Sequence, residues 1–333
     1  MSANAAIPSG AGASAGDPSG RAQPSASTPA AIPAPPGRKP VVSVRGLVKH
    51  FPGNPKPTLD GVTLDIYPGE TVVIMGGSGC GKSTFLRCLI GSHRPEAGSI
   101  HMFGRDLAEV DERGLDEVRK RFGILFQSGA LFNSMTLAEN VALPLQEHTQ
   151  LDQATINTIV KIKLEQVALR EHADKYPAQI SGGMKKRAGL ARAMALDPKI
   201  LFYDEPSAGL DPVTSAEIDQ LILALTRKLG VTSVVVTHEM DSAFTIADRM
   251  VMLDKGRVLH IDTRDWFHNL RAMSAAEAAD QPEDHQLIRQ FLRGDAEGPI
   301  TQRRMSTDYA DDLLGRPATV AATPSVEPTR TMS

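Results

Sequence analysis

The sequence contains few cysteines and no long apolar run, and each absence narrows what the protein can be. Only two of its 333 residues, Cys80 and Cys88, are cysteines, which excludes a small secreted scaffold held together by disulfides. No apolar stretch approaches the roughly 18–20 residues that a membrane-spanning helix needs. The chain does not open with a charged segment followed by an apolar one, so we expect no secretory signal.

A charge excess of one sign is also missing. The 36 Lys and Arg residues nearly balance the 39 Asp and Glu residues, which leaves a formal net charge of −3. Dedicated nucleic-acid binders usually carry a basic excess, so the balance argues against one. Hydrophobic residues still make up 41 % of the chain. We therefore expect an intracellular globular protein with a sizeable core, whose length suits about two domains.

Composition divides the chain into a core and two tails. Residues 1–40 are dominated by Ala, Pro, Ser and Gly, which bury too little apolar surface to offset the entropy of ordering, so we predict a disordered tail. An organelle transit peptide is the alternative, but amphipathic helical spacing is missing. Residues 295–333 are again polar, and we expect an extended or loosely ordered extension. Its apolar residues Tyr309, Leu313 and Leu314 would either contact a second subunit or belong to a frayed terminus.

Apolar runs alternate with helical stretches between the tails, from residue 41 to residue 294. The predicted strands are VVSVRGLVKHF, GVTLDIYPGE, TVVIM, KILFYDEP and TSVVVTHE. The last two are continuous apolar runs, which suits a sheet covered on both faces. STFLRCLIGSH and TSAEIDQLILALTRKLG are helical patterns, and residues 129–195 form a mostly helical insertion. This alternation predicts an α/β fold with a mostly parallel sheet.

A glycine-rich loop directly follows the apolar run TVVIM. Its residues fit the phosphate-loop pattern G-x-x-x-x-G-K-S/T and are Gly76, Gly77, Ser78, Gly79, Cys80, Gly81, Lys82, Ser83 and Thr84. Glycines let backbone N–H groups surround phosphate oxygens, and the helix that follows directs its positive dipole end at the same anion. We predict that Lys82 contacts the β- and γ-phosphates of ATP and that Ser83 binds Mg²⁺.

A magnesium–nucleotide site needs a second anchor, and the segment KILFYDEP supplies one. Asp204 ends the apolar run, where it can hold the metal. Glu205 follows it, and a carboxylate there can orient and deprotonate the attacking water. Two acidic residues in a strand-to-loop turn would mean little alone, so this interpretation depends on the phosphate loop.

With these motifs, the chain resembles the ATP-binding cassette (ABC) family over about residues 41–265. The further matching residues are the signature S-G-G, the D-loop aspartate, the switch histidine and the Q-loop glutamine, which are Ser181, Gly182, Gly183, Asp211, His238 and Gln127. Their order along the chain is the family's order. The resemblance implies an ATPase with an α/β phosphate-loop core, an antiparallel β portion and an inserted α-helical subdomain.

The resemblance also implies that two copies share each site. In this family the signature of one subunit closes on the ATP of the other, so Ser181 and the N–H groups of Gly182 and Gly183 would hold the γ-phosphate in trans. That arrangement predicts a dimer with two-fold symmetry. His238 would stabilise the γ-phosphate and the attacking water. Gln127 would contact Mg²⁺ or water and relay the nucleotide state to a partner.

Other positions follow from the same resemblance. Phe51 lies where the family places an aromatic ring against adenine, with a small hydrophobic plug as the alternative. Asp211 is assigned to the nucleotide site. Met184 stands where the signature commonly has Gln and cannot hydrogen-bond as Gln does, but we expect activity to survive. The basic run KKR at 185–187 is interpreted as a solvated helix face rather than an RNA contact.

Longer segments resemble the ATPase subunit of the Mla-type phospholipid transporters of Gram-negative bacteria. They are ILFQSGALFNSMTLAENVALPLQEHTQLD, IRQFLRGDAEGPI and DYADDLL. The resemblance implies a cytoplasmic ATPase on the inner membrane that works with a separate permease, a periplasmic lipid-binding subunit and a small accessory regulator. Its work would maintain outer-membrane lipid asymmetry. We expect a permease helix in a groove between core and insertion, lined by Leu131, Phe132 and Met135, with ordinary insertion core as the alternative.

Other functions stay open from the sequence. An ABC ATPase that serves another substrate, such as an organic solvent, an amino acid or a metal, would have the same nucleotide core. A cassette ATPase that acts on nucleic acid is less favoured, because the chain holds one signature and sustains no heptad repeat.

Overall fold

Two β-sheets organise the computed structural model, which describes residues 37–301. The antiparallel sheet has the order β2-β1-β4-β5 and consists of β1 (Val42–Lys49), β2 (Leu59–Ile66), β4 (Ala97–Met102) and β5 (Arg105–Asp106). The second sheet has the order β10-β9-β3-β8-β7-β6 and consists of β3 (Thr71–Met75), β6 (Phe122–Leu125), β7 (Ile200–Asp204), β8 (Thr232–Val236), β9 (Arg249–Asp254) and β10 (Arg257–Thr263). Its pairs are parallel except β9–β10. The predicted α/β fold with an antiparallel portion is confirmed.

The continuous apolar runs are explained by two cores on the two faces of the parallel sheet. On β3, Val73 and Met75 pack into one core, with the helical insertion and the later helices. Val72 and Ile74 point the other way, into a core shared with the antiparallel sheet and α1 (Lys82–Leu89). Because successive strand residues alternate between two buried faces, neither set can be polar.

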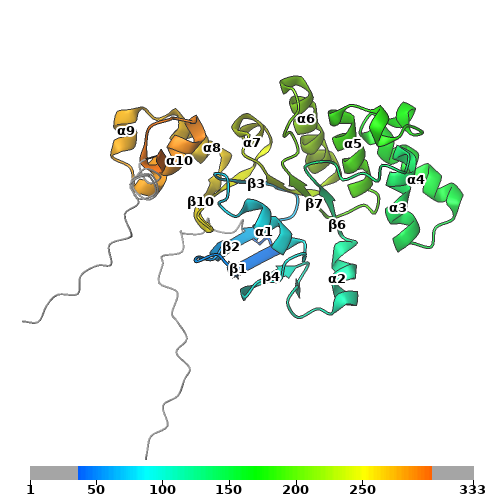
Figure 1. The fold of residues 1–333 in the computed structure, drawn as a ribbon, viewed down its shortest axis with the longest axis horizontal. Helices are drawn as coiled ribbons and strands as arrows, with labels where there is room; N and C mark the ends of the chain where they lie inside the picture. The colour runs from blue at the N-terminus through cyan, green and yellow to red at the C-terminus, as the bar shows by residue number, and fades with distance from the viewer. Residues whose placement is uncertain (1–36, 302–333) are drawn as a thin grey trace, which may run out of the picture.

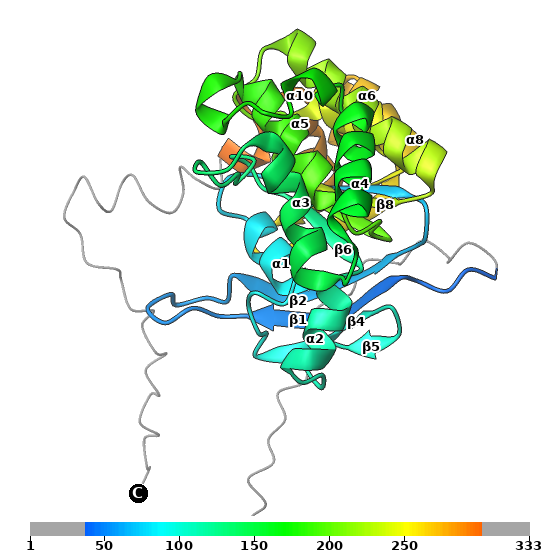
Figure 2. The same ribbon diagram turned by 90° about the vertical axis from the view of Figure 1, so that its right-hand side faces the viewer.

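The predicted helical insertion lies between β6 and β7. It contains α3 (Leu137–His148), α4 (Gln153–Gln166), α5 (Gly182–Ala193) and two short 3₁₀ turns (Arg170–His172 and Pro177–Gln179). Figure 1 shows these helices gathered at one end of the molecule, and Figure 2 views that end directly. α2 (Glu112–Arg119) precedes β6, beside the antiparallel sheet.

The remaining helices follow β7. They are α6 (Pro212–Leu229), α7 (Met240–Ile246), α8 (Arg264–Ala272), α9 (Ala275–Ala279) and α10 (Glu283–Arg293). The last three form a group at the end of the molecule opposite the helical insertion (Figure 1). The parallel sheet therefore lies between two helical ends, and its strand ends are free to carry a site.

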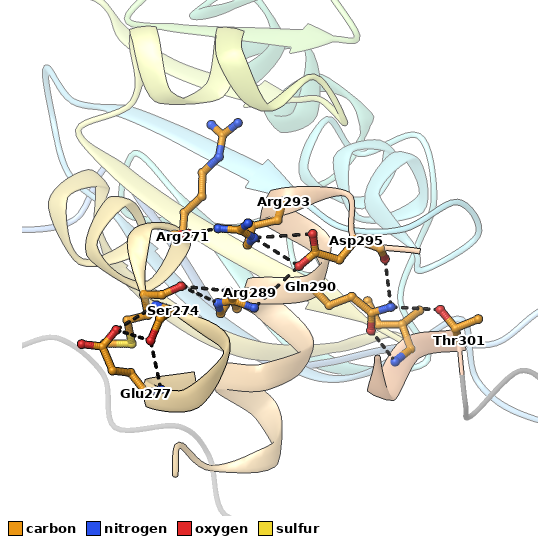
Figure 3. A network of polar contacts seen from close by, with 10 residues as sticks. Arg271, Ser274, Glu277, Arg289, Gln290, Arg293, Asp295 and Thr301 are labelled. Carbon is orange, nitrogen blue, oxygen red and sulfur yellow. Dashed lines mark hydrogen bonds and ion pairs between the residues drawn. The ribbon is translucent and has the colours of Figure 1, made fainter. Parts of the chain in front are cut away.

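The chain just beyond Gly294 differs from the expected extended segment, because residues 295–301 fold back on α10. The Gln290 amide nitrogen donates to the Asp295 carbonyl at 3.1 Å and to the Thr301 hydroxyl at 2.9 Å. The Gln290 amide oxygen accepts from the backbone N–H of Ile300 at 2.7 Å. Figure 3 shows this network, in which Arg293 also pairs with Asp295. Tyr309, Leu313 and Leu314 lie outside the described residues, as do residues 1–36.

Two absences in the sequence have structural counterparts. Within residues 37–301, no helix is both long and apolar enough to span a bilayer. Both thiols are free and buried, with Cys80 5 % and Cys88 1 % exposed. Burial raises the pKa of Cys88 to about 11, so this thiol stays protonated at neutral pH.

Candidate nucleotide site

Three predicted motifs meet at one edge of the parallel sheet. The glycine-rich loop follows β3, Asp204 and Glu205 lie at the end of β7, and His238 follows β8. β8 lies between β3 and β7, and all three strands run parallel. Because the carboxyl ends of parallel strands share one edge, residues far apart in the sequence become neighbours there.

The loop between β3 and α1 requires its glycines. Gly76 has φ 153°, and a Cβ atom there would lie 2.2 Å from the Leu253 carbonyl oxygen. Gly81 has φ 110°, and its Cβ would lie 2.8 Å from the Thr58 carbonyl oxygen. Only glycine fits both the backbone conformation and the space at these positions. Gly76, Cys80 and Gly81 are buried, Gly77 and Thr84 are half-buried, and Ser78, Gly79 and Ser83 are exposed.

Lys82 occupies the interior of this loop. It is 9 % exposed, and its ammonium donates to the carbonyl oxygens of Gly76 at 2.7 Å and Gly77 at 3.1 Å. α1 begins at Lys82 without a side-chain cap, so its first N–H groups have no side-chain acceptor. A helix N-terminus, glycine N–H groups and one ammonium therefore converge, which suits a polyphosphate.

Asp204 is a half-buried carboxylate with unused hydrogen-bonding capacity. Its Oδ1 is buried and has no hydrogen-bond partner within the described part of the chain. Burial, followed by the neighbouring Glu205, raises the pKa of Asp204, and Arg87 and Lys82 oppose the rise. A positive charge placed beside this carboxylate would favour its ionised form.

Glu205 and His238 form a direct pair. The His238 Nδ1 atom lies 2.8 Å from Glu205 Oε2, and the backbone N–H of His238 donates to the same oxygen at 3.3 Å. Glu205 has a left-handed φ of 50°, and its own N–H donates to the Val236 carbonyl at 2.9 Å. The Glu205 side chain is 13 % exposed and that of His238 is 60 % exposed. The pair thus has one face open to a ligand.

The residues at this edge fit magnesium better than a metal held by protein alone. No group of three or more His, Cys, Asp or Glu that could hold a metal ion occurs among residues 37–301. Mg²⁺ commonly binds one or two carboxylates together with substrate phosphates and water. One carboxylate oxygen of Asp204, which has no hydrogen-bond partner among the described residues, and the hydroxyl of the exposed Ser83 could supply two protein ligands of this kind.

The signature residues lie at the exposed end of α5. Ser181 caps this helix, because its hydroxyl accepts from the Met184 N–H at 3.3 Å. Ser181 and Gly182 are exposed, whereas Gly183 is buried, and a Cβ atom on Gly183 would lie 2.4 Å from Thr214 Cγ2. No hydrogen bond between described residues joins the signature to the glycine-rich loop. The predicted contact of the signature with a nucleotide therefore stays a prediction.

Asp211 has a local structural role at the start of α6. Its Oδ1 accepts from the N–H groups of Val213 and Thr214, both at 3.1 Å, and its Oδ2 accepts from the Thr214 hydroxyl at 2.6 Å. The hydrogen bonds from Thr214, above all the one from its hydroxyl, lower the pKa of Asp211. A charged helix cap results, and the predicted nucleotide contact stays a prediction.

The structure also shows the surroundings of Gln127, Phe51 and Met184. Gln127 is exposed in the turn after β6, where the helical insertion begins. The Phe51 ring meets His93 edge-on at 5.5 Å between ring centroids, with the Lys49 ammonium 5.2 Å from the ring. Met184 packs partly buried against the core of the helical insertion. The roles of Gln127 and Phe51 at the nucleotide stay predictions.

The sequence interpretation of the basic run at 185–187 is wrong for its middle residue. Lys186 is 5 % exposed, and its ammonium donates to the carbonyl oxygens of Glu205 at 3.1 Å and Ala208 at 2.8 Å. The spacing along the helix could have predicted the burial of Lys186, because Gly183, Lys186 and Leu190 follow the three- and four-residue spacing of one buried face. The positive charge of Lys186 led to the wrong prediction.

A groove between the core and the helical insertion has a volume of about 590 Å³. Its lining includes Phe122, Ile124 and Phe126 from the core, and Pro144, His148, Arg192 and Leu196 from the insertion. The expected lining residues were wrong, because Leu131, Phe132 and Met135 do not line it. Leu131 packs against the insertion core, and the Phe132 ring lies 5.9 Å from the Arg192 guanidinium.

Comparisons with known proteins agree with the geometry. A family profile described as ABC transporter matches residues 59–208. The chain is 45 % identical to a protein of Mycobacterium leprae named "Probable ribonucleotide transport ATP-binding protein mkl", over 79 % of this chain and 73 % of that one. It is 40 % identical to "Intermembrane phospholipid transport system ATP-binding protein MlaF" of Haemophilus influenzae, over 77 % of this chain and 92 % of that one.

Solved structures show the same architecture. One is a dimeric ATP-binding cassette in a post-hydrolysis state bound to ADP and phosphate, with a TM-score of 0.62 and 31 % identity over 67 % of this chain and 98 % of that one. Another is cbiO1 of Clostridium perfringens, described as part of the ABC transporter complex cbiONQ, with a TM-score of 0.65 and 26 % identity over 75 % of this chain and 98 % of that one.

Proposed function

The chain belongs to the ABC transporter family and is an ATPase coupled to transport, and from this premise we propose that its cargo is phospholipid. The proposed protein drives lipid movement through a separate inner-membrane permease and maintains outer-membrane lipid asymmetry. The observation that carries this proposal is the similarity to MlaF along nearly that protein's whole length. The segment after the Q-loop, which resembles Mla-type subunits, supports the same cargo.

Hydrolysis is assigned to the pair of Glu205 and His238. Glu205 acts as the general base that orients the attacking water and takes its proton, because its carboxylate is mostly buried but open on one face. His238 fixes that carboxylate through two nitrogen contacts and stabilises the γ-phosphate. The phosphate loop and Lys82 hold the triphosphate in line, so that catalysis consists mainly of positioning and charge stabilisation.

Magnesium would be held at this edge by Ser83, Asp204 and Gln127. When bound, it supplies positive charge that neutralises the phosphate oxygens. The free Asp204 oxygen supports its part in this set, and the exposed Ser83 at the first turn of α1 supports the second. Gln127 is exposed in the turn after β6, next to Phe126, which lines the groove. It would therefore link the state of the nucleotide to the helix bound in that groove.

ABC cassettes dimerise and work with a membrane permease, and two specific surfaces are proposed here. Ser181, Gly182 and Gly183 hold the γ-phosphate of the second copy, which the exposed end of α5 supports. The permease lays a helix in the groove between core and insertion. Its aromatic floor at Phe122 and Phe126 suits the apolar side of that helix.

The location follows from those contacts. The proposed protein is peripheral to the cytoplasmic face of the inner membrane and is held there through the permease. A small accessory regulator on the helical insertion and a periplasmic lipid-binding subunit complete the proposed complex. The exposed Ile162 on α4 is a suitable apolar contact for such a regulator, since it is 51 % exposed.

Reconstitution tests the cargo directly. The full chain is purified with its permease, and the complex is placed in liposomes that contain a fluorescent phospholipid. We expect ATP-dependent lipid movement that is lost in the Glu205→Gln variant. ATP hydrolysis without lipid movement would contradict phospholipid as the cargo.

Ribonucleotide is the second candidate cargo. It is favoured by the similarity to the mycobacterial protein that carries this substrate in its name. The same liposomes, loaded with a radiolabelled ribonucleotide in place of the fluorescent lipid, separate the two candidates. Movement of the ribonucleotide alone would favour this second cargo.

A further inference from the structure

Lys186 is a buried charge that the proposed mechanism leaves unused. Lysine is almost never fully buried unless it is partnered. Here the ammonium has two main-chain acceptors, the Ala208 carbonyl at 2.8 Å and the Glu205 carbonyl at 3.1 Å. Burial lowers the pKa of Lys186, and the carboxylates of Glu239 and Glu205 oppose this change. The partners of the ammonium therefore lie on the buried side of α5.

Both acceptors belong to the turn that carries the proposed general base. Glu205 has φ 50°, a conformation that non-glycine residues adopt only when their surroundings hold them in it. The Ala208 N–H donates to the Glu205 carbonyl at 3.3 Å, so the same oxygen closes the turn and accepts from Lys186. The ammonium thus contacts both ends of the turn that sets the direction of the Glu205 side chain.

The other end of the same helix carries the signature. Ser181 caps α5, and Lys186 lies between one and two turns further along it. The helix packs closely against its neighbours at two glycines. A Cβ atom on Gly189 would lie 2.8 Å from the Gly129 carbonyl oxygen, and one on Gly183 would lie 2.4 Å from Thr214 Cγ2. A helix held this closely moves as one body. A displacement at Ser181 therefore reaches the turn at Glu205 through Lys186.

We propose that Lys186 is a positioning residue that holds the Glu205 turn against the signature helix and so links the two nucleotide sites of the dimer. The inference rests on the proposed function, in which Ser181 contacts the ATP of the second copy and Glu205 acts on the ATP of its own chain. Closure of the signature on one nucleotide then fixes the general base beside the other. A single ammonium supplies this link because it can bond two carbonyl oxygens at once.

Substitutions at position 186 separate the effect of the hydrogen-bond donor on the Glu205 turn from the effect of side-chain volume. Lys186→Met keeps an unbranched apolar stem but leaves both carbonyl oxygens without their donor. Lys186→Arg keeps a charged donor group in the same place. Lys185→Met is the matched control, because the Lys185 side chain makes no hydrogen bond or ion pair with any residue in 37–301.

The experiment measures steady-state ATP hydrolysis and nucleotide affinity of the full-length variants. We expect Lys186→Met to lower kcat at least about tenfold while KM for ATP changes less than about twofold, because misplacement affects the reacting geometry and not the phosphate loop. Lys186→Arg should restore most of the rate, and Lys185→Met should match the parent. Lys186→Ala, which also lacks a donor but leaves space for water beside the two carbonyl oxygens, gives the same test if the Met variant does not fold.

Two results would overturn the inference. One is a parent-like kcat in Lys186→Met or, where that variant does not fold, in Lys186→Ala. The other is an equal loss in the Arg and Met variants together with weakened ATP binding, which indicates a purely structural residue. Glu205→Gln, assayed in parallel, keeps the two proposals apart. If it hydrolyses ATP at the parent rate, the proposed role of Glu205 fails, whatever Lys186 does.

Discussion

The two halves of the nucleotide site in this chain are built in opposite ways. The phosphate-loop half has a buried interior and a contact between strands, since Lys82 is 9 % exposed and Glu205 bonds His238 from another strand. The signature half consists of exposed helix caps, in which the side chains of Ser181 and Asp211 bond only residues two or three positions away. In the proposed function, the first half holds the nucleotide of its own chain, and the signature half contacts the nucleotide of a second copy.

Glu205→Gln tests the buried half with the largest expected effect. The amide cannot take a proton from water, so turnover should fall by about two orders of magnitude or more. The loop and Lys82 are untouched, so ATP binding should persist and the dimer should stay closed around uncleaved ATP. Steady-state hydrolysis and size-exclusion chromatography with ATP measure both effects. A parent-like rate would remove Glu205 from its role.

Gly76→Ala tests whether the loop needs its backbone shape. The new Cβ would lie 2.2 Å from the Leu253 carbonyl oxygen, so the loop must shift and ATP affinity should fall at least about tenfold. Gly77→Ala is the graded comparison, because no atom lies within 4 Å of its added Cβ. Titration with a fluorescent ATP analogue ranks the two variants. Equal affinities would contradict the strain argument.

Ser181→Ala tests the exposed half. It removes one predicted donor to the partner's γ-phosphate, so turnover should fall by about one to two orders of magnitude while each chain still binds ATP. The matched control is Thr136→Ala, which removes the side-chain cap of α3 in the same helical insertion. That variant should lose only helix stability, by about 1 kcal/mol. A drop in ATP affinity in Ser181→Ala would show that the signature serves its own chain.

Lowering the pH tests a region outside both halves and has the smallest expected effect. His260 stacks on Trp266 at 3.8 Å between ring centroids, and burial, with His285 adding to it, lowers the pKa of His260 below 6.5. The folded state then binds fewer protons than the unfolded one. The stability from this group is present above pH 6.5 and is lost as the pH falls through the lowered pKa.

The single tryptophan makes this effect visible. Trp266 fluorescence and thermal unfolding should change together as the pH falls below 6.5, and His260→Gln should flatten both responses. ATP affinity should not follow the same curve, because the cluster lies at the C-terminal helices. An unchanged pH response in His260→Gln would assign the effect to another group.

Local patterns in the sequence predicted the buried half well. The runs that form β3, β7 and β8 are buried on both faces of the sheet. The loop after β3 has the glycine and lysine spacing of a phosphate loop. These signals are contained in a few neighbouring residues. The sequence motifs assigned Glu205 and His238 separate roles but did not predict their direct contact, which follows from the observed order of the parallel strands.

Features set by packing between distant segments could not be predicted. Lys186 was interpreted as solvated because its charge outweighed its position on the helix, and only the turn at Glu205 explains its burial. The groove lining was misassigned because Leu131 packs inward, and β6 and α5 supply the floor instead. Which face of a segment is covered depends on a neighbour that the local pattern does not contain.

Mixing two inactive variants tests most directly whether each nucleotide is hydrolysed between two copies. The Glu205→Gln variant lacks the general base but keeps an intact signature. The Ser181→Arg variant keeps the general base but has a blocked signature. A mixed dimer contains one site in which both contributions are intact. We expect more ATP hydrolysis in the mixture than the sum of the two separate rates. A mixture no more active than that sum, with mixed dimers present, would contradict it.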